Sequence, residues 1–281
     1  MAGKNNFIKN FKKHKLACVG LVFVIIEILA VTLLPIILKA DPYVMDSLNF
    51  NQAPSAQHWV GTDDVGRDIF ARLLYGGRVS LMVGILSTII SIVIGLPLGL
   101  LAGYYRGMIE SIVMRFCDIF MSVPTMVLIL VIVAVFEPSL VTIITVIGIT
   151  GWPAVAKLIY GNVLSVRSKE YVEAAKAIGT RDRVIILKYV LPNSVAPLWM
   201  TVAFRISQAI ITESSLSFLG AGIQAPQASW GNIIYAAQNL VVLTQRWWIW
   251  LPAGLLLMLT VVSINLVGEG VRDALDPKMK R

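Results

Sequence analysis

Residues 79–105 read VSLMVGILSTIISIVIGLPLGLLAGYY, and this stretch contains no charged residue. A helix of about 20 mainly apolar residues is long enough to cross the hydrocarbon core of a membrane. Such a span must be helical, because its backbone N–H and C=O groups find no water in the hydrocarbon. The stretch therefore predicts a transmembrane helix and an integral membrane protein.

The composition of the whole chain supports the same interpretation. Of 281 residues, 57% are hydrophobic and 14% are charged, and the mean hydropathy is +0.78. A soluble protein of this composition would lack a polar exterior, so lipid must solvate much of the chain. Cys18 and Cys117 lie in or beside apolar runs, and neither belongs to a CxxC pair. We interpret both as small buried hydrophobic residues.

Five more apolar stretches are long enough to span a membrane, so we predict an all-α protein with six transmembrane helices. The five are residues 16–38, 119–136, 138–156, 189–216 and 247–268. Pro97, Pro124 and Pro153 can kink the second, third and fourth spans. Residues 214–245 are also uncharged, but several Gly and one Pro interrupt them. We expect an irregular extracytoplasmic or re-entrant piece there.

Basic residues indicate the orientation, because loops rich in Lys and Arg stay in the cytoplasm. The N-terminal segment, the loop after residue 105, the loop before the fifth span and the tail carry 18 of the 24 Lys and Arg residues. Both termini are therefore expected in the cytoplasm, which agrees with an even number of spans. The first apolar run is too long for a secretory signal, so we expect an uncleaved anchor. The net charge of +8 then reflects topology rather than nucleic-acid binding.

The loop before the fifth span contains the sequence SKEYVEAAKAIG at residues 168–179, followed after nine residues by YVLP. Its residues favour a short amphipathic helix, with Ala174 and Ala175 leaving a smooth face for close packing. Gly179 is suited to end that helix in a left-handed conformation. A smooth helix at the membrane surface can insert into a groove of a partner protein. An ordinary basic loop fits the composition equally well.

The spacing of Glu-Ala-Ala, three residues, Gly, nine residues and x-x-Leu-Pro resembles the EAA loop of ABC importer permeases. In that family the loop is the coupling helix that docks onto the ATP-hydrolysing subunit. The resemblance implies this coupling role for Glu173, Ala174, Ala175, Gly179, Leu191 and Pro192. Tyr189 departs from the pattern, because such permeases often have Ile or His at its position.

Further motifs narrow the resemblance to one subgroup. They are HWVGTDDVGRDIFAR at residues 58–72, ESSLSFLG at 213–220, SWGN at 229–232 and NLVGEGVRDALDP at 265–277. Together they are similar to the second permease subunit of the dipeptide, oligopeptide and nickel importers. This resemblance implies the type I ABC importer permease fold and a multi-pass protein of the bacterial cytoplasmic membrane.

The resemblance also implies an organisation and a set of partners. An N-terminal anchor helix and an extracytoplasmic amphipathic segment would occupy residues 1–78. The transmembrane core would occupy residues 79–281, with the coupling loop at about 162–193. The partners would be a homologous permease, two ATPase subunits that bind ATP and Mg, and an extracytoplasmic peptide-binding protein. The chain itself would need no cofactor.

Three charged residues fall inside predicted spans, where a charge costs roughly 2.5–3.5 kcal/mol on insertion scales. Arg205 and Glu213 are two helical turns apart, so we expect them on one face of the fifth span. They would either line the translocation path or form an ion pair within the chain or between subunits. Glu27, in the first span, would face the partner permease.

The stretch from Trp59 to Arg72 is mixed in charge, and we place it outside the cytoplasm. Asp63, Asp64, Arg67 and Asp68 could pair with one another in a self-capping element on the membrane face. Alternatively, these residues and Trp59 would contact the partner permease or the substrate-binding protein.

Sequence signatures of catalysis are missing from the chain. It contains no GxxxxGK[ST] phosphate loop, no HExxH and no GxSxG, and its only histidines are His14 and His58. We therefore expect a transport subunit without catalytic or metal-binding residues. Within that class, a nickel or metal-chelate importer is the alternative to a peptide importer. A secondary transporter driven by an ion gradient is the alternative from another class, and an intramembrane enzyme would need a catalytic constellation.

Overall fold

The computed structural model describes residues 10–195 and 197–275, and the described chain is helical apart from its loops and one isolated bridge between Thr62 and Asp68. Of the basic residues expected near the two termini, Lys4, Lys9, Lys278, Lys280 and Arg281 lie outside the described residues. The long helices are α2 (Lys15–Ile37), α3 (Ile69–Tyr105), α6 (Leu140–Arg167), α10 (Leu198–Phe218) and α13 (Trp247–Leu275). The shorter elements are α4 (Gly107–Ser122), α5 (Thr125–Val135), α7 (Glu170–Ala177), α8 (Asp182–Val184), the π-helix η1 (Ile185–Val190), α9 (Leu191–Ser194), α11 (Trp230–Tyr235), the 3₁₀-helix η2 (Ala236–Gln238) and α12 (Leu240–Gln245).

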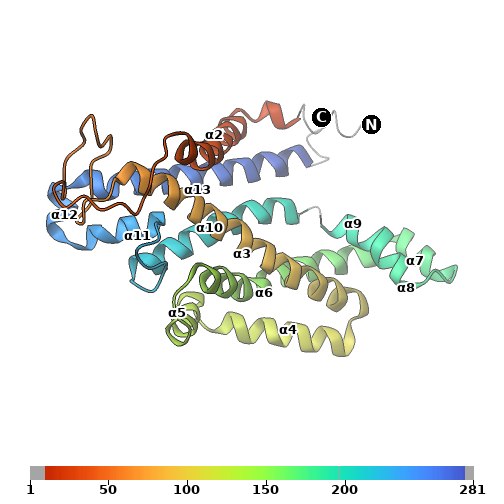
Figure 1. The fold of residues 1–281 in the computed structure, drawn as a ribbon. Helices are drawn as coiled ribbons and strands as arrows, with labels where there is room; N and C mark the ends of the chain where they lie inside the picture. Colours follow the sequence, from red (N-terminus) through yellow and green to blue (C-terminus); the bar gives the residue numbers. More distant parts are fainter. Residues whose placement is uncertain (1–9, 196, 276–281) are drawn as a thin grey trace.

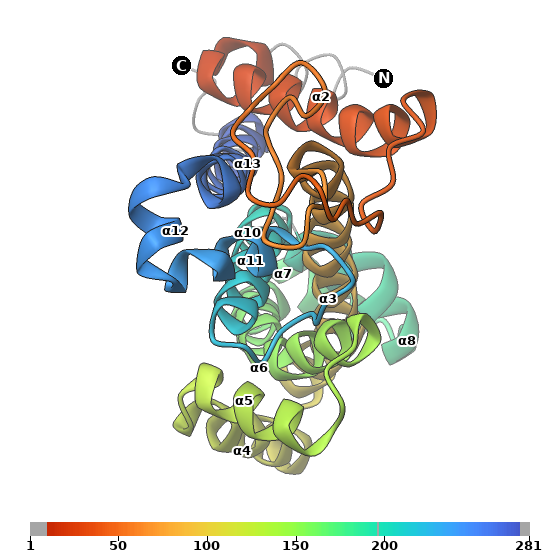
Figure 2. The ribbon, with the colours of Figure 1, turned by 60° about the vertical axis from the view of Figure 1, so that its left-hand side comes forward.

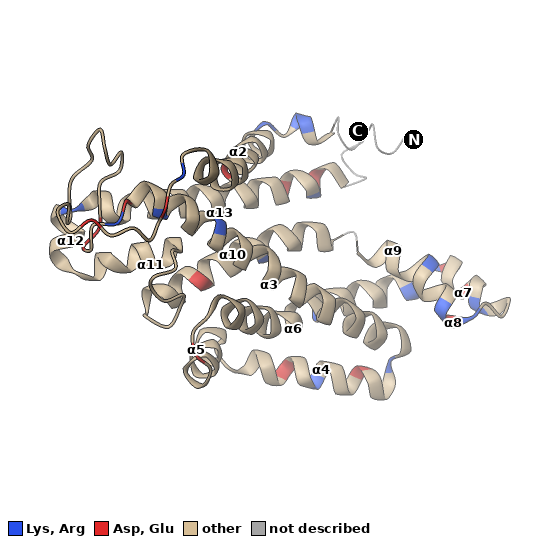
Figure 3. Ribbon diagram, viewed as in Figure 1, with Lys and Arg blue, Asp and Glu red and all other residues tan. Residues whose placement is uncertain are grey.

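The long helices run between two ends of the molecule (Figure 1). One end carries α7 and α8, and we call it the α7 end. The opposite end, the α12 end, carries the loop between α2 and α3 together with α11 and α12. Seen from a second direction, α2 and the pair α4–α5 lie on opposite sides of the bundle (Figure 2). Charged residues gather near the two ends, while the middle of the bundle is mostly uncharged (Figure 3).

Four helices are long and apolar enough to cross a membrane: α2, α3, α6 and α13. Two bent pairs, α4 with α5 and the segment Asp182–Ser194 with α10, raise the number to six if each pair is one span. The all-α membrane fold is therefore confirmed, with four to six spans. The irregular segment expected within residues 214–245 is present as the three short elements α11, η2 and α12.

The prediction of residues 119–136 as one kinked helix was wrong. Helix α4 ends at Ser122, and α5 leaves it at an angle of 86°. The cause is Pro124, which disfavours helical geometry in the residue before it. Val123 accordingly has the extended angles φ −96° and ψ 134°. The fifth stretch, 189–216, is also not one helix, because α10 begins only at Leu198, after Pro197, and a bend of 64° separates it from the preceding segment.

Helices α3 and α6 form a close interface through three glycines of α3 that are spaced four residues apart. Gly95 faces the backbone of α6, where a Cβ atom would lie 2.6 Å from the carbonyl oxygen of Trp152. Gly99 lies against the backbone of Ala156, and Gly103 packs against Val163. Small residues at this spacing let two membrane helices approach closely, so their backbones gain van der Waals contact.

Helix α2 packs on α13 and α3, and its acidic residue faces inward. Glu27 is buried, and its Oε1 accepts a hydrogen bond from the Thr260 hydroxyl of α13 at 2.5 Å. The expectation that Glu27 faces the partner permease was therefore wrong. Arg78 donates hydrogen bonds to the Val31 carbonyl, which attaches α2 to α3. The boundary expected at residue 78 falls inside α3, which runs unbroken from Ile69.

Candidate functional site

The loop at the α7 end contains the amphipathic helix that the sequence predicted. Helix α7 spans Glu170–Ala177, and Gly179 ends it with a φ of +75°. This left-handed conformation is the one that favours glycine at a helix C-terminus. Val172 and Ala175 are buried, whereas Glu173 is exposed. The helix thus keeps one face on the bundle and turns the other outward.

Two of the expected coupling residues lie outside α7, on the way back to the membrane. Leu191 is partly buried and packs on the same hydrophobic cluster as Val172 and Ala175. Pro192 lies in the first turn of α9, which follows η1 directly. The structure therefore places the Leu-Pro pair at the base of the loop rather than at its tip.

Helices α7 and α8 are attached to the end of α3 by contacts that sequence reasoning missed. The Tyr104 hydroxyl donates a hydrogen bond to Asp182 Oδ1 at 2.6 Å, and Lys176 Nζ lies 4.8 Å from the centre of the Tyr104 ring. These residues are up to 78 positions apart, so no local pattern indicates that they meet. Tyr104 therefore joins both α7 and α8 to α3, the longest helix of the described chain.

The outward side of this loop carries apolar side chains that the described chain leaves uncovered. Ile178 is 82% exposed and Leu187 is 63% exposed, and Tyr171 is exposed as well. An exposed group of this kind beside a short amphipathic helix is typical of a surface that binds another protein. Together with the exposed Glu173 and Ala174, it forms what we call the loop surface.

Arg205 and Glu213 do not form an ion pair, so the version of the prediction that paired them within this chain was wrong. Arg205 Nη2 donates to the Ser91 hydroxyl at 3.2 Å. Glu213 is fully buried and accepts hydrogen bonds from the hydroxyls of Ser217 at 2.7 Å and Ser80 at 3.2 Å. Eight residues advance a helix by about 80° beyond two full turns. The two side chains therefore point toward different neighbours.

Arg205 belongs to a polar face of α10 that the sequence did not reveal as a unit. It shares a cavity of about 280 Å³ with Gln208 and Thr212, three and seven residues further along the helix. Helices α4, α5 and α6 supply the opposite wall, including Thr150. Gln208 is exposed within the described chain. The polar face of α10 is therefore accessible at Gln208 from outside the described chain.

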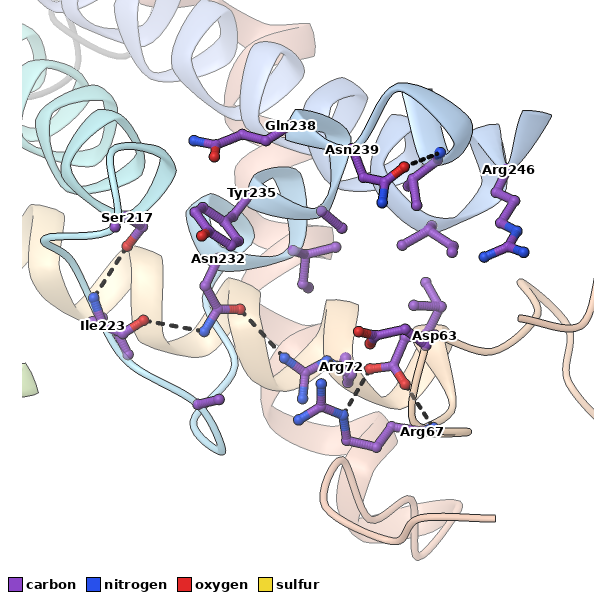
Figure 4. Close-up of a pocket in the computed structure, with 18 of the residues that line it drawn as sticks. Asp63, Arg67, Arg72, Ser217, Ile223, Asn232, Tyr235, Gln238, Asn239 and Arg246 are labelled. Carbon is purple, nitrogen blue, oxygen red and sulfur yellow. Dashed lines mark hydrogen bonds and ion pairs between the residues drawn. The ribbon is translucent and has the colours of Figure 1, made fainter. Parts of the chain in front are cut away.

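A larger pocket of about 620 Å³ lies at the α12 end, between the start of α3 and residues 217–246 (Figure 4). Asp63 is buried there and accepts a hydrogen bond from Arg67 Nε at 2.7 Å. The Arg72 Nε lies 3.6 Å from the same carboxylate oxygen. The second oxygen accepts from the backbone N–H groups of Val65 and Arg67.

The rest of the predicted extracytoplasmic element is also paired within itself. Asp68 caps α3 by accepting a hydrogen bond from Ala71 N, and its other oxygen lies 2.7 Å from His58 Nδ1. Trp59 differs, because its side chain is 61% exposed and touches Phe70 at a ring-centre distance of 5.1 Å. Asp63, Arg67 and Asp68 thus hold the element together, whereas Trp59 is left on the surface.

Apolar spanning helices form the bundle, a loop helix lies at one end, and polar cavities lie along its height. This is the architecture of a membrane transport subunit. Residues 95–281 match the family model described as the binding-protein-dependent transport system inner membrane component. Residues 5–54 match the N-terminal TM domain of oligopeptide transport permease C. The chain belongs to this family of ABC transporter permeases and is a multi-pass protein of the bacterial inner membrane.

Relatives of known name cover nearly the whole chain. The chain is 37% identical to the oligopeptide transport system permease protein OppC of Bacillus subtilis (strain 168), over 96% of this chain and 88% of that protein. It is 39% identical to the dipeptide transport system permease protein DppC of the same organism, over 97% and 85%. It is 37% identical to the glutathione transport system permease protein GsiD of Pectobacterium atrosepticum, over 82% and 76%.

A solved structure shows the same fold. An inward-facing conformation of the MetNI methionine ABC transporter matches with a TM-score of 0.60 at 20% sequence identity, covering 73% of this chain and 96% of that chain. A permease of this family is the membrane-spanning component and works with an ATPase and a binding protein. The ABC importer permease fold expected from the EAA loop is therefore confirmed.

Proposed function

We propose that this chain transports small peptides inward, as one of two permease subunits in an importer driven by separate ATPases. Three named relatives are permeases for oligopeptides, dipeptides and glutathione, and each covers at least 82% of this chain. The observation that carries the proposal is the loop surface, which presents Glu173 and exposed apolar side chains on and beside α7, a helix whose Lys176 packs on Tyr104 of α3. That arrangement suits a surface on which an ATPase subunit docks.

The proposed orientation places the α7 end in the cytoplasm and the α12 end outside. The distribution of Lys and Arg supports it, because the segment from Lys157 in α6 to Lys188 in η1 carries seven of them. Two ATPase subunits would bind the loop surfaces of this permease and of a homologous partner. An extracytoplasmic binding protein would deliver peptide at the α12 end.

The test of the proposed function is reconstitution of the complete importer in proteoliposomes. The complex would contain this chain, its homologous permease, the ATPase subunits and the binding protein. We expect ATP-dependent uptake of labelled dipeptides and tripeptides. Uptake of Ni²⁺ without uptake of peptide would replace the proposal by the nickel or metal-chelate alternative. Uptake that persists without ATPase subunits would favour an ion-coupled transporter.

The polar face of α10 formed by Arg205, Gln208 and Thr212 is proposed to line the translocation path. In a variant whose two cysteines are replaced by serine, Gln208→Cys should react with a water-soluble maleimide. Leu255→Cys is the matched control, because Leu255 is an exposed apolar residue of α13 and should face lipid. Equal labelling of both positions would contradict an aqueous path along α10.

The contact between Tyr104 and Asp182 is proposed to position the coupling helix. Tyr104→Phe removes one hydrogen bond to a charged group, worth about 1.5–3 kcal/mol, and leaves the ring that Lys176 covers. We expect peptide uptake per ATP hydrolysed to fall several-fold, measured on the reconstituted complex, with folding retained. In a background with Tyr104 intact, Asp182→Asn should retain part of the coupling, because an amide oxygen can still accept from the Tyr104 hydroxyl. Unchanged stoichiometry in Tyr104→Phe would show that this contact does not transmit movement.

A further inference from the structure

The pocket at the α12 end contains more positive than negative charge. Three arginines line it, Arg67, Arg72 and Arg246, but only two carboxylates, Asp63 and Asp64. Asp63 is shared by two of the arginines and also accepts two backbone N–H groups, so its acceptor positions are occupied. The pocket therefore has one guanidinium in excess. An anionic group entering it would be attracted rather than repelled.

Arg246 is the guanidinium that remains available. Within residues 10–195 and 197–275, its side chain makes no hydrogen bond or ion pair. It is half-buried between α12 and α13 and lies at the opposite end of the pocket from Ser217 in Figure 4. Arg72, by contrast, is 4% exposed, and its Nη1 donates to the carbonyl oxygens of Pro42 and Pro226 at 3.5 Å. A planar guanidinium with free donors matches a carboxylate with two parallel hydrogen bonds.

Other groups in the pocket suit the rest of a short peptide. The exposed side chains of Asp64 and Tyr235 make no hydrogen bond within the described part of the chain, and both line the cavity. The Gln238 amide uses its N–H₂ on the Phe218 carbonyl, which leaves its oxygen free to accept from a peptide N–H. The volume of about 620 Å³ lies within the range of small-molecule sites, roughly 300–1,000 Å³.

We propose that this pocket is an entry subsite for peptides, in which Arg246 binds the free C-terminal carboxylate. Asp64, which lines the same cavity, would bind the N-terminal ammonium group. The inference rests on the proposed function, because it takes the transported molecule to be a peptide. It goes beyond that function by assigning the first contact of the peptide with this subunit to a defined pocket.

The experiment compares trialanine with its C-terminal amide in proteoliposomes that contain the whole importer and its binding protein. The apparent KM for uptake of each is measured in wild type, Arg246→Gln, Arg246→Lys and Lys39→Gln. Lys39 is the matched control, because it is an exposed cation that follows α2 and lies outside the pocket. The preference of the binding protein for the acid is the same in every variant and cancels when variants are compared.

We expect the KM ratio between amide and acid to fall about tenfold or more in Arg246→Gln, the size expected for a lost hydrogen bond to a charged group. Arg246→Lys should recover part of the ratio, and Lys39→Gln should leave it unchanged. An unchanged ratio in Arg246→Gln, with wild-type uptake intact, would overturn the inference and leave the proposed function standing. A loss of uptake that is equal for acid and amide would also overturn it, because it would assign Arg246 to a carboxylate of the binding protein. Absence of uptake by wild type would instead reject the proposed function.

Discussion

Reversing the charge of Glu173 should abolish peptide uptake while leaving the permease folded and inserted. Glu173 is exposed on α7 and its carboxylate makes no hydrogen bond or ion pair in the described chain, so its replacement by lysine removes no internal side-chain contact. In the proposed complex this carboxylate is covered by the ATPase. Breaking a charge pair in such an interface costs about 2–5 kcal/mol, which corresponds to a loss of about thirtyfold or more in affinity.

The measurement is ATP hydrolysis and peptide uptake by the reconstituted complex, with pull-down of the ATPase subunits. Glu137→Lys is the matched control, because Glu137 is an exposed acid in the turn between α5 and α6, far from α7 in the chain. It should retain both activities. Wild-type uptake in Glu173→Lys, with normal ATPase binding, would refute the coupling assignment of this residue.

Gly99→Leu should prevent the bundle from forming. A Cβ atom on Gly99 would overlap the backbone of Ala156, and backbone atoms cannot move aside as a flexible side chain can. Helices α3 and α6 would have to separate along their whole interface, including at Gly95 and Gly103. Overpacking of a core typically costs about 1–3 kcal/mol and sometimes more, and this site lies at the upper end because the obstacle is backbone.

Gly161→Leu is the control for Gly99→Leu, because a Cβ at Gly161 in α6 would meet no atom within 4 Å. We expect Gly161→Leu to accumulate in the membrane like wild type, whereas Gly99→Leu should be degraded or elute as aggregate after detergent extraction. The midpoint of thermal unfolding in detergent provides the quantitative comparison. Equal midpoints for the two variants would contradict the close packing of α3 on α6.

Local patterns were sufficient to predict the spanning helices and the loop helix, since both depend on residues close in the chain. The first, second, fourth and sixth apolar stretches each lie largely within one helix. The break at Pro124 was present in the sequence as a proline, but its angle depends on how α5 packs against α6. The glycines at 95, 99 and 103 were also visible as a four-residue repeat, and that signal was overlooked.

The amino-acid sequence by itself determined that this chain is a helical membrane protein with the EAA spacing of ABC importer permeases and a short amphipathic helix in that loop, because apolar length and motif spacing are local properties. Only the tertiary structure decided which partners the buried charges take. Glu27 contacts Thr260, 233 residues away, and Arg72 contacts Asn232, 160 residues away. Such contacts depend on the path of the whole chain through the bundle. For the same reason, the pocket that brings Asp64 and Arg246 together could not be read from either segment alone.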